Sequence, residues 1–178
     1  MNKRQRIVVV GHGMVGHRFA QAAVERGLTE THDIVVFGEE PRAAYDRVAL
    51  TSWFGHARDG QGSEALSLLP GGEYDDPRVR LVLDSVVTEI DRDARTVTVV
   101  SPPSAARSRD GRRSALLDQR EDVGAVTVHD YDVLVLATGA APFVPPVEGR
   151  GKDGCFVYRT IEDLQAIKAA SESATSGV

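Results

Sequence analysis

The sequence contains a single cysteine, Cys155, among 178 residues. One cysteine cannot form an internal disulfide, a four-cysteine zinc site or an iron–sulfur cluster from ligands of this chain alone. Any electron chemistry of the chain would therefore need an organic cofactor. Basic residues are also scarce, because 21 Lys and Arg stand against 26 Asp and Glu for a net charge of −5. This balance gives no electrostatic basis for binding nucleic acid, and we expect no such partner.

Long apolar runs are missing from the N-terminal region. The run at residues 7–10 ends at Gly11, which makes it too short for the core of a signal peptide or for a transmembrane helix. We therefore expect no membrane contact and a cytoplasmic location. The length of 178 residues allows one full α/β domain with a short appendage, but not two complete nucleotide-binding domains.

The first 40 residues have the pattern of a βαβ unit. Residues 7–10 are uniformly apolar and β-branched, which is typical of a central parallel strand. The sequence GHGMVG follows at residues 11–16, and apolar residues then recur at helical spacing over 14–26. A second apolar run at residues 34–37 predicts the next buried strand. Strand, glycine turn, helix and strand follow in the order of a nucleotide-binding βαβ unit.

The glycine motif in this context predicts a dinucleotide site. In G-x-G-x-x-G the first glycine allows a tight turn, the second allows close approach of a pyrophosphate, and the third allows close packing of helix on strand. The turn presents the positive N-terminus of a helix to the phosphates. Glu39, at the end of the second strand, is placed to bind the adenosine ribose. The alternative is a glycine turn that only packs a helix on a sheet. The candidate residues of this part of the site are Gly11, His12, Gly13, Met14, Val15, Gly16, Glu39 and Glu40.

The rest of the chain predicts a mixed architecture without further βα repeats. The alternating apolar pattern favours a small antiparallel layer, and the apolar run before ATG favours another buried strand. A Pro-, Ser- and Arg-rich stretch interrupts the pattern as a mobile insertion. The expected elements are a short helix at 43–54, a polar loop at 55–63, the antiparallel layer at 80–100, the insertion at 101–124, a strand at 133–136 and a helix at 160–170.

The remaining candidate groups favour structural roles. Cys155 is expected to be a small buried residue, and we predict neither a catalytic side chain nor a metal site in this chain. The histidines show no ligand-like spacing with cysteine or carboxylates, and we expect them to be solvated or to lie in loops. They are His12, His17, His32, His56 and His129.

Three separated motifs carry a resemblance to a known family. GHGMVGHRF at residues 11–19, EEPRAAYDRVALTSWF at 39–54 and CFVYRTIEDLQAI at 155–167 are similar to the large subunit of NAD(P)H-dependent assimilatory nitrite reductase. This family belongs to the flavoprotein reductases with two dinucleotide-binding domains, in which an ATG turn closes against the flavin nucleotide. The resemblance implies FAD as cofactor. It also implies that Arg47 reaches toward the FAD nucleotide and that the ATG turn, residues Ala137, Thr138 and Gly139, lines the FAD groove.

The resemblance implies a division of this chain and further parts outside it. We expect an α/β, Rossmann-like FAD-binding domain at residues 1–150, incomplete at its C-terminus. Residues 151–178 are expected to form a connector strand and helix leading to an absent NAD(P)H-binding domain. The family also carries iron–sulfur and sirohaem centres and has a small subunit as a possible partner. In the family a later segment completes the FAD domain, so we expect this chain alone to bind FAD weakly and not to reduce nitrite.

Two alternatives stay open at this point. One is a ferredoxin- or rubredoxin-reductase-like flavoprotein, although Ser52 stands where many such relatives have a lysine near the flavin. The other is an inactive, truncated dinucleotide-binding module.

Overall fold

A computed structural model describes residues 4–58, 62–102 and 124–176. The described chain divides into two compact units. The first comprises the described parts of Met1–Tyr45, Ser67–Ser108 and Gln119–Gly139, and the second those of Asp46–Leu66 and Ala140–Val178. The predicted insertion at residues 101–124 lies outside the described residues for positions 103–123.

A parallel sheet of four strands forms the centre of the first unit. The strands lie in the order β3-β2-β1-β7, and every neighbouring pair is parallel. The strands are β1 (Gln5–Val10), β2 (His32–Phe37), β3 (Val79–Val82) and β7 (Val133–Leu136). The helix α1 (Met14–Glu25) connects β1 to β2 through the short 3₁₀ helix η1 (Leu28–Glu30), which confirms the predicted βαβ unit.

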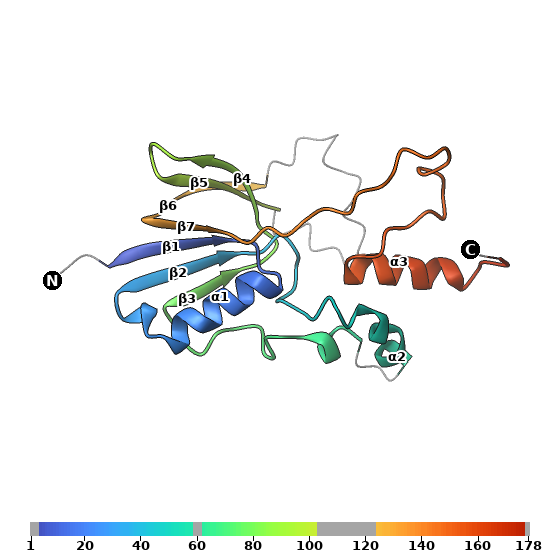
Figure 1. The fold of residues 1–178 in the computed structure, drawn as a ribbon, viewed down its shortest axis with the longest axis horizontal. Coiled ribbons are helices and arrows are strands. Elements are labelled where there is room, and N and C mark those ends of the chain that lie inside the picture. Colours follow the sequence, from blue (N-terminus) through green and yellow to red (C-terminus); the bar gives the residue numbers. More distant parts are fainter. Residues whose placement is uncertain (1–3, 59–61, 103–123, 177–178) are drawn as a thin grey trace. The chain divides into compact units, whose positions relative to one another are not determined.

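The two faces of the parallel sheet are covered by different layers (Figure 1). Successive side chains of a strand point to opposite faces. Ile7 and Val9 therefore pack with Ala20 and Ala23 of α1, while Val8 and Val10 face the other way. Each of the four residues from Ile7 to Val10 is at most 8 % exposed. The uniform apolar run that predicted a central strand is thus explained by burial on both faces.

The layer opposite α1 is a three-stranded antiparallel sheet. Its strands β4 (Val86–Asp91), β5 (Thr96–Ser101) and β6 (Ala125–Asp130) lie in the order β4-β5-β6. Val97 and Val99 of β5 are buried with Val8 and Phe37 of the parallel sheet. The predicted antiparallel layer is therefore confirmed.

The start of that predicted layer is wrong, because β3 belongs to the parallel sheet. β3 pairs with β2 from Ile34↔Val79 to Phe37↔Val82. The chain then breaks at Asp84, whose φ is +57°, and Ser85 donates its amide to the Gly38 carbonyl at 2.9 Å. This bend separates β3 from β4, and an alternating pattern does not distinguish one sheet from the other.

The described residues of the second unit form two α-helices and two 3₁₀ turns. They are η2 (Leu50–Ser52), α2 (Trp53–Arg58), η3 (Glu64–Leu66) and α3 (Ile161–Ser171). The predicted helix at residues 160–170 is confirmed. Thr160 and Asp163 form a capping box at its start, in which each side chain accepts a hydrogen bond from the other residue's amide.

Two other expectations for these segments are wrong. The helix predicted at 43–54 begins only at η2 and α2, because the Asp46 carboxylate accepts hydrogen bonds from the amides of Val48 and Ala49 and forms a turn instead. A strand and a helix were expected at residues 151–178, and the described part of this segment, up to residue 176, contains the helix but no strand. Among the described helices, none has the length and apolar character needed to span a bilayer.

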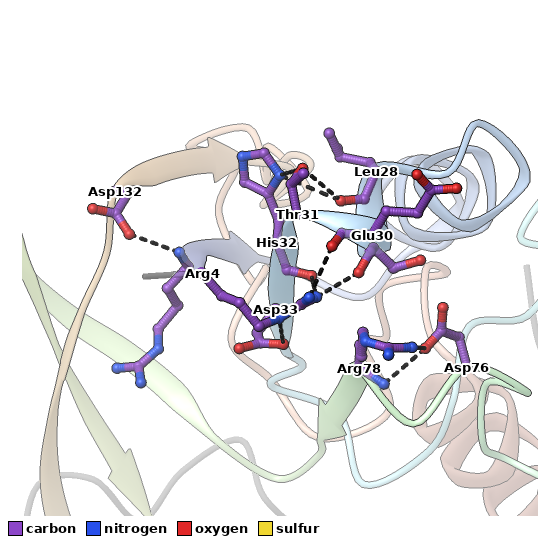
Figure 2. Close-up of polar contacts among 11 residues, drawn as sticks. Arg4, Leu28, Glu30, Thr31, His32, Asp33, Asp76, Arg78 and Asp132 are labelled. Carbon is purple, nitrogen blue, oxygen red and sulfur yellow. Dashed lines mark hydrogen bonds and ion pairs between the residues drawn. The ribbon is translucent and has the colours of Figure 1, made fainter. Parts of the chain in front are cut away.

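An arginine holds the corner between α1 and β2 (Figure 2). The Arg4 guanidinium donates to the Asp33 carboxylate at 3.0 Å, to the carbonyl oxygens of Glu30 at 2.8 Å and His32 at 2.9 Å, and to that of Thr29. These carbonyls lie in η1 and where it leads into β2. The planar fork of an arginine reaches several acceptors at once, which a lysine ammonium cannot do.

We expect both Arg4→Ala and Arg4→Lys to lower the free energy of unfolding by about 1 kcal/mol, since the side chain is partly solvated. Urea unfolding followed by circular dichroism measures this change. Arg18→Ala is the control, because among the described residues Arg18 donates hydrogen bonds to Gln21 and Glu25 alone, on the exposed surface of α1. Equal stability of Arg4→Lys and the wild type would contradict the role of the fork.

Candidate functional site

The carboxyl ends of three parallel strands bring the predicted site residues to one edge of the sheet. The glycine loop follows β1, Glu39 follows β2 and the ATG turn follows β7. Hydrogen bonds continue the sheet into these loops, from the Gly11 amide to the Phe37 carbonyl and from the Ala137 amide to the Val10 carbonyl, both at 2.8 Å. β1 lies between β2 and β7, so the strands that follow β1 in the chain are added first on one side of it, as β2 and β3, and later on the other side, as β7. Ligands of open α/β sheets bind at such a point.

Two glycines of the loop let backbone segments touch. A Cβ on Gly11 would lie 2.3 Å from the Ala137 carbonyl oxygen, and the φ of Gly11 is +105°. A Cβ on Gly16 would lie 2.0 Å from the Gly11 carbonyl oxygen. Any side chain at either position would separate β1, α1 and the ATG turn. The roles predicted for the first and third glycines, tight turn and close packing, therefore fit this geometry.

Gly13 differs from the other two because the space around it is open. Nothing lies within 4 Å of a Cβ built on this residue, and it is the N-cap of α1. No side chain caps the helix and no acidic residue lies in its first turn. The amides of Met14 and Val15 therefore have no acceptor among the described residues, and both residues are exposed. Such a helix N-terminus favours an anionic ligand.

The two carboxylates after β2 have different surroundings. Glu39 is exposed, and its carboxylate has no hydrogen-bond partner among the residues described. Glu40 is half-buried and accepts a hydrogen bond from the Tyr45 hydroxyl at 2.9 Å. Glu39 is therefore the carboxylate that is available to a ligand.

The remaining predicted residues are divided between the two units, with the ATG turn in the first and Arg47 in the second. Thr138 and Gly139 are exposed directly after the Ala137 contact with the glycine loop, and the φ of Gly139 is +71°. Arg47 lies in the second unit, where its guanidinium donates to the Arg159 carbonyl at 3.3 Å. The glycine loop, Glu39 and the ATG turn are thus brought together within one unit. The role of Arg47 toward a flavin stays a prediction.

Two histidines and a tyrosine form a cluster that the sequence did not reveal. The exposed fraction of His12 is 8 % and that of His17 is 6 %, so the expectation of solvated or loop histidines is wrong for His17 and incomplete for His12, which is a loop residue but buried. The Tyr74 hydroxyl lies 3.0 Å from His12 Nε2 and 3.0 Å from His17 Nδ1. Tyr74 is far away in the sequence and outside any periodic pattern, so no local signal connects it to the loop.

The surroundings of these three side chains shift their pKa values. Burial, with a smaller contribution from the neighbouring His17, lowers the pKa of His12 to about 4. Burial and the nearby Arg18 guanidinium lower the pKa of His17. Burial raises the pKa of the Tyr74 hydroxyl. All three groups are therefore neutral near pH 7.

Cys155 is exposed, which contradicts the expectation of a buried residue. Its thiol faces the Gly149 carbonyl at 3.5 Å, in a segment of turns that offers no apolar layer to cover it.

In the described part of the chain, no group of three or more His, Cys, Asp or Glu residues is arranged to hold a metal ion.

The parallel sheet, the glycine crossing and the open helix N-terminus define a Rossmann-type dinucleotide-binding unit. Residues 5–176 match the family described as pyridine nucleotide-disulphide oxidoreductase, and the chain belongs to this family. Members of the family bind flavin and NAD(P)H, so a dinucleotide site is expected at this edge of the sheet.

The similarity extends over almost the whole chain. The chain is 43 % identical over 97 % of its length to the nitrite reductase [NAD(P)H] large subunit of Klebsiella oxytoca. It is 36 % identical, again over 97 % of its length, to the nitrite reductase (NADH) large subunit of Escherichia coli. The chain spans 15 % and 17 % of these two relatives. The predicted resemblance to nitrite reductase large subunits is thereby confirmed.

A solved structure supports the same fold. The chain is similar to a putidaredoxin reductase, seen in a covalent complex with putidaredoxin, with a TM-score of 0.67 and 26 % identity. The match covers 95 % of this chain and 34 % of that one.

The three glycines are expected to respond differently to a methyl group. Gly16→Ala should lower the free energy of unfolding by about 2 to 3 kcal/mol, because the new Cβ overlaps the Gly11 carbonyl. Gly13→Ala should change stability by less than about 0.5 kcal/mol, because its space is open. Chemical denaturation of both variants measures the difference. Similar losses of unfolding free energy in both variants would contradict the close approach of the backbone at Gly16 to the Gly11 carbonyl.

We also expect the chain to lose stability on mild acidification. A histidine in the unfolded chain is protonated below about pH 6.5, whereas the folded His12 resists protonation until about pH 4. The unfolded state therefore binds more protons in this window. The contribution of this cluster to the free energy of unfolding should be constant between about pH 7 and 9 and fall as the pH drops from about 6.5 to 4.

Denaturation of the wild type and of His12→Asn at a series of pH values tests this expectation. The carboxylates contribute equally to both proteins, so the difference isolates the histidine cluster. The variant should lose less stability than the wild type between pH 7 and 4.5. Parallel curves would rule out the contribution of His12.

Proposed function

We propose that the chain is the FAD-binding part of a nitrite-reductase-type NAD(P)H oxidoreductase. In this proposal it supports electron transfer from NAD(P)H through FAD toward iron–sulfur and sirohaem centres carried by other sequence. The observation that carries the proposal is the glycine crossing at Gly11 and Gly16, which leaves Gly13 and the free amides of α1 open beside the ATG turn.

The residues present fit a dinucleotide. The open space at Gly13 admits a pyrophosphate close to the backbone, and the uncapped amides of Met14 and Val15 are suitable donors to its oxygens. Glu39 is exposed at the end of β2, where its carboxylate would accept hydrogen bonds from the adenosine ribose. Glu40 supports the same edge through its bond to Tyr45.

FAD, when bound, supplies the hydride and electron chemistry, and the protein supplies position and electrostatics. His12 would contribute through its backbone in the glycine loop. Ala137, Thr138 and Gly139 would line the groove beside the loop, and Arg47 would reach toward the nucleotide.

The degree of similarity favours the nitrite reductase class over the ferredoxin-reductase class. The identity to the Klebsiella large subunit is 43 %, compared with 26 % to the putidaredoxin reductase. Ser52 also stands where ferredoxin-reductase-like relatives carry a lysine. We further propose that residues 1–150 serve FAD and that residues 151–178 lead toward a domain for NAD(P)H. A nitrite reductase small subunit is the protein partner in this proposal.

We expect Glu39→Gln to weaken FAD binding about tenfold or more, because an ionised acceptor forms the stronger hydrogen bonds with hydroxyl groups. Titration of the 178-residue chain with FAD, followed by flavin fluorescence, measures the dissociation constant. Glu89→Gln is the matched control. Glu89 is exposed on β4, and this substitution removes the same negative charge as Glu39→Gln.

Two results would count against the proposal. A wild-type chain that shows no FAD binding at any reachable concentration would contradict FAD as its ligand. Equal affinities of Glu39→Gln and Glu89→Gln would move the ribose site away from Glu39.

A further inference from the structure

The buried histidine cluster joins three separate segments around the glycine loop. His12 belongs to the loop, His17 follows in the first turns of α1, and Tyr74 precedes β3. A second bond holds the His12 ring from the other side, because the Ala44 amide donates to His12 Nδ1 at 3.0 Å. Ala44 is itself buried, at 2 % exposure. All of these residues belong to the first unit.

The hydrogen-bond partners fix the position of every proton in the cluster. The Ala44 amide is a donor only, so His12 Nδ1 must be the acceptor. A neutral His12 then carries its proton on Nε2 and donates it to the Tyr74 oxygen. The tyrosine proton is left to donate to His17 Nδ1, so His17 is also protonated on Nε2. The result is a one-way chain from the Ala44 amide to His17 in which each donor has one acceptor.

This chain holds the loop at a point where α1 itself provides no restraint. No side chain caps the helix, so the amides of Met14 and Val15 are kept in place only through the backbone of the loop. His12 lies one residue before the cap and His17 donates its amide to the Gly13 carbonyl at 2.9 Å. The anchors therefore lie on both sides of the open residue Gly13. His12 is also closely packed on the side of β2, since a Cβ on Gly38 would lie 3.0 Å from His12 Cβ.

We propose that the His12–Tyr74–His17 cluster is a positioning device that holds the glycine loop ready for the pyrophosphate of the dinucleotide. The assignment of the ligand rests on the proposed function. The device acts through the loop backbone, and the imidazoles need not touch the ligand. A loop that is already ordered binds more tightly because binding does not have to order it.

The test compares Tyr74→Phe with Tyr131→Phe. Both changes remove one tyrosine hydroxyl from the same unit, but Tyr131 donates to the Asp91 carbonyl at the hairpin of the antiparallel sheet. We expect Tyr74→Phe to bind FAD about tenfold more weakly, while Tyr131→Phe stays within about twofold of the wild type. Equal affinities of the two variants would overturn the proposal.

A second measurement requires no ligand. In the Tyr74→Phe protein we expect the two hydrogen-bonded amides that flank the loop to exchange with solvent at least about tenfold faster, with exchange in β1 and β2 unchanged. They are the amide of Gly11, which donates to the Phe37 carbonyl, and that of His17, which donates to the Gly13 carbonyl. Acceleration confined to the loop would distinguish positioning from a general loss of stability. Unchanged loop exchange, or acceleration throughout the unit, would overturn the proposal.

The proton positions give a third readout. Long-range ¹H–¹⁵N correlation spectra at pH 7 should show both His12 and His17 with the proton on Nε2, and a proton on His12 Nδ1 would overturn the proposed chain. If the wild type failed to bind FAD, the proposed function would fail, yet the exchange and tautomer measurements would still decide whether the cluster holds the loop.

Discussion

The contact on which the site depends is a crossing of three backbone segments at Gly11, Gly16 and Ala137. The chain leaves β1, enters α1 and later returns after β7, and at this point no side-chain carbon fits between the segments. The close approach fixes where α1 begins and places the ATG turn beside its first amides. The same contact determines both the packing of the first unit and the space available to a dinucleotide.

Side chains add what the backbone crossing lacks. Glycines allow the close approach but also leave the loop with more conformational freedom than other residues would. The buried bonds of His12 and His17 restrict that freedom without adding bulk at the open residue Gly13. The loop thus combines a backbone that can approach a ligand closely with side-chain anchors that lie behind it.

The sequence predicted the βαβ unit well because its signals are local. The apolar run at residues 7–10 and the glycine spacing each determine structure within a few positions. The antiparallel layer was predicted in kind, but β3 was assigned to the wrong sheet, since alternation does not identify a pairing partner. The Tyr74 contacts could not be predicted, because 62 residues separate His12 from Tyr74. The prediction of a helix at residues 43–54 was wrong because the turn formed by Asp46 competes with helix formation.

The burial of β1 on both faces also bears on how the sequence tolerates mutation. Each residue from Ile7 to Val10 contacts either the helical layer or the antiparallel layer, and none is left to face solvent. A polar substitution would have no accessible orientation, and a shift of one position would exchange the two layers' side chains. The route from β1 into Gly11 therefore accepts few replacements, whereas the exposed positions of β4 accept many.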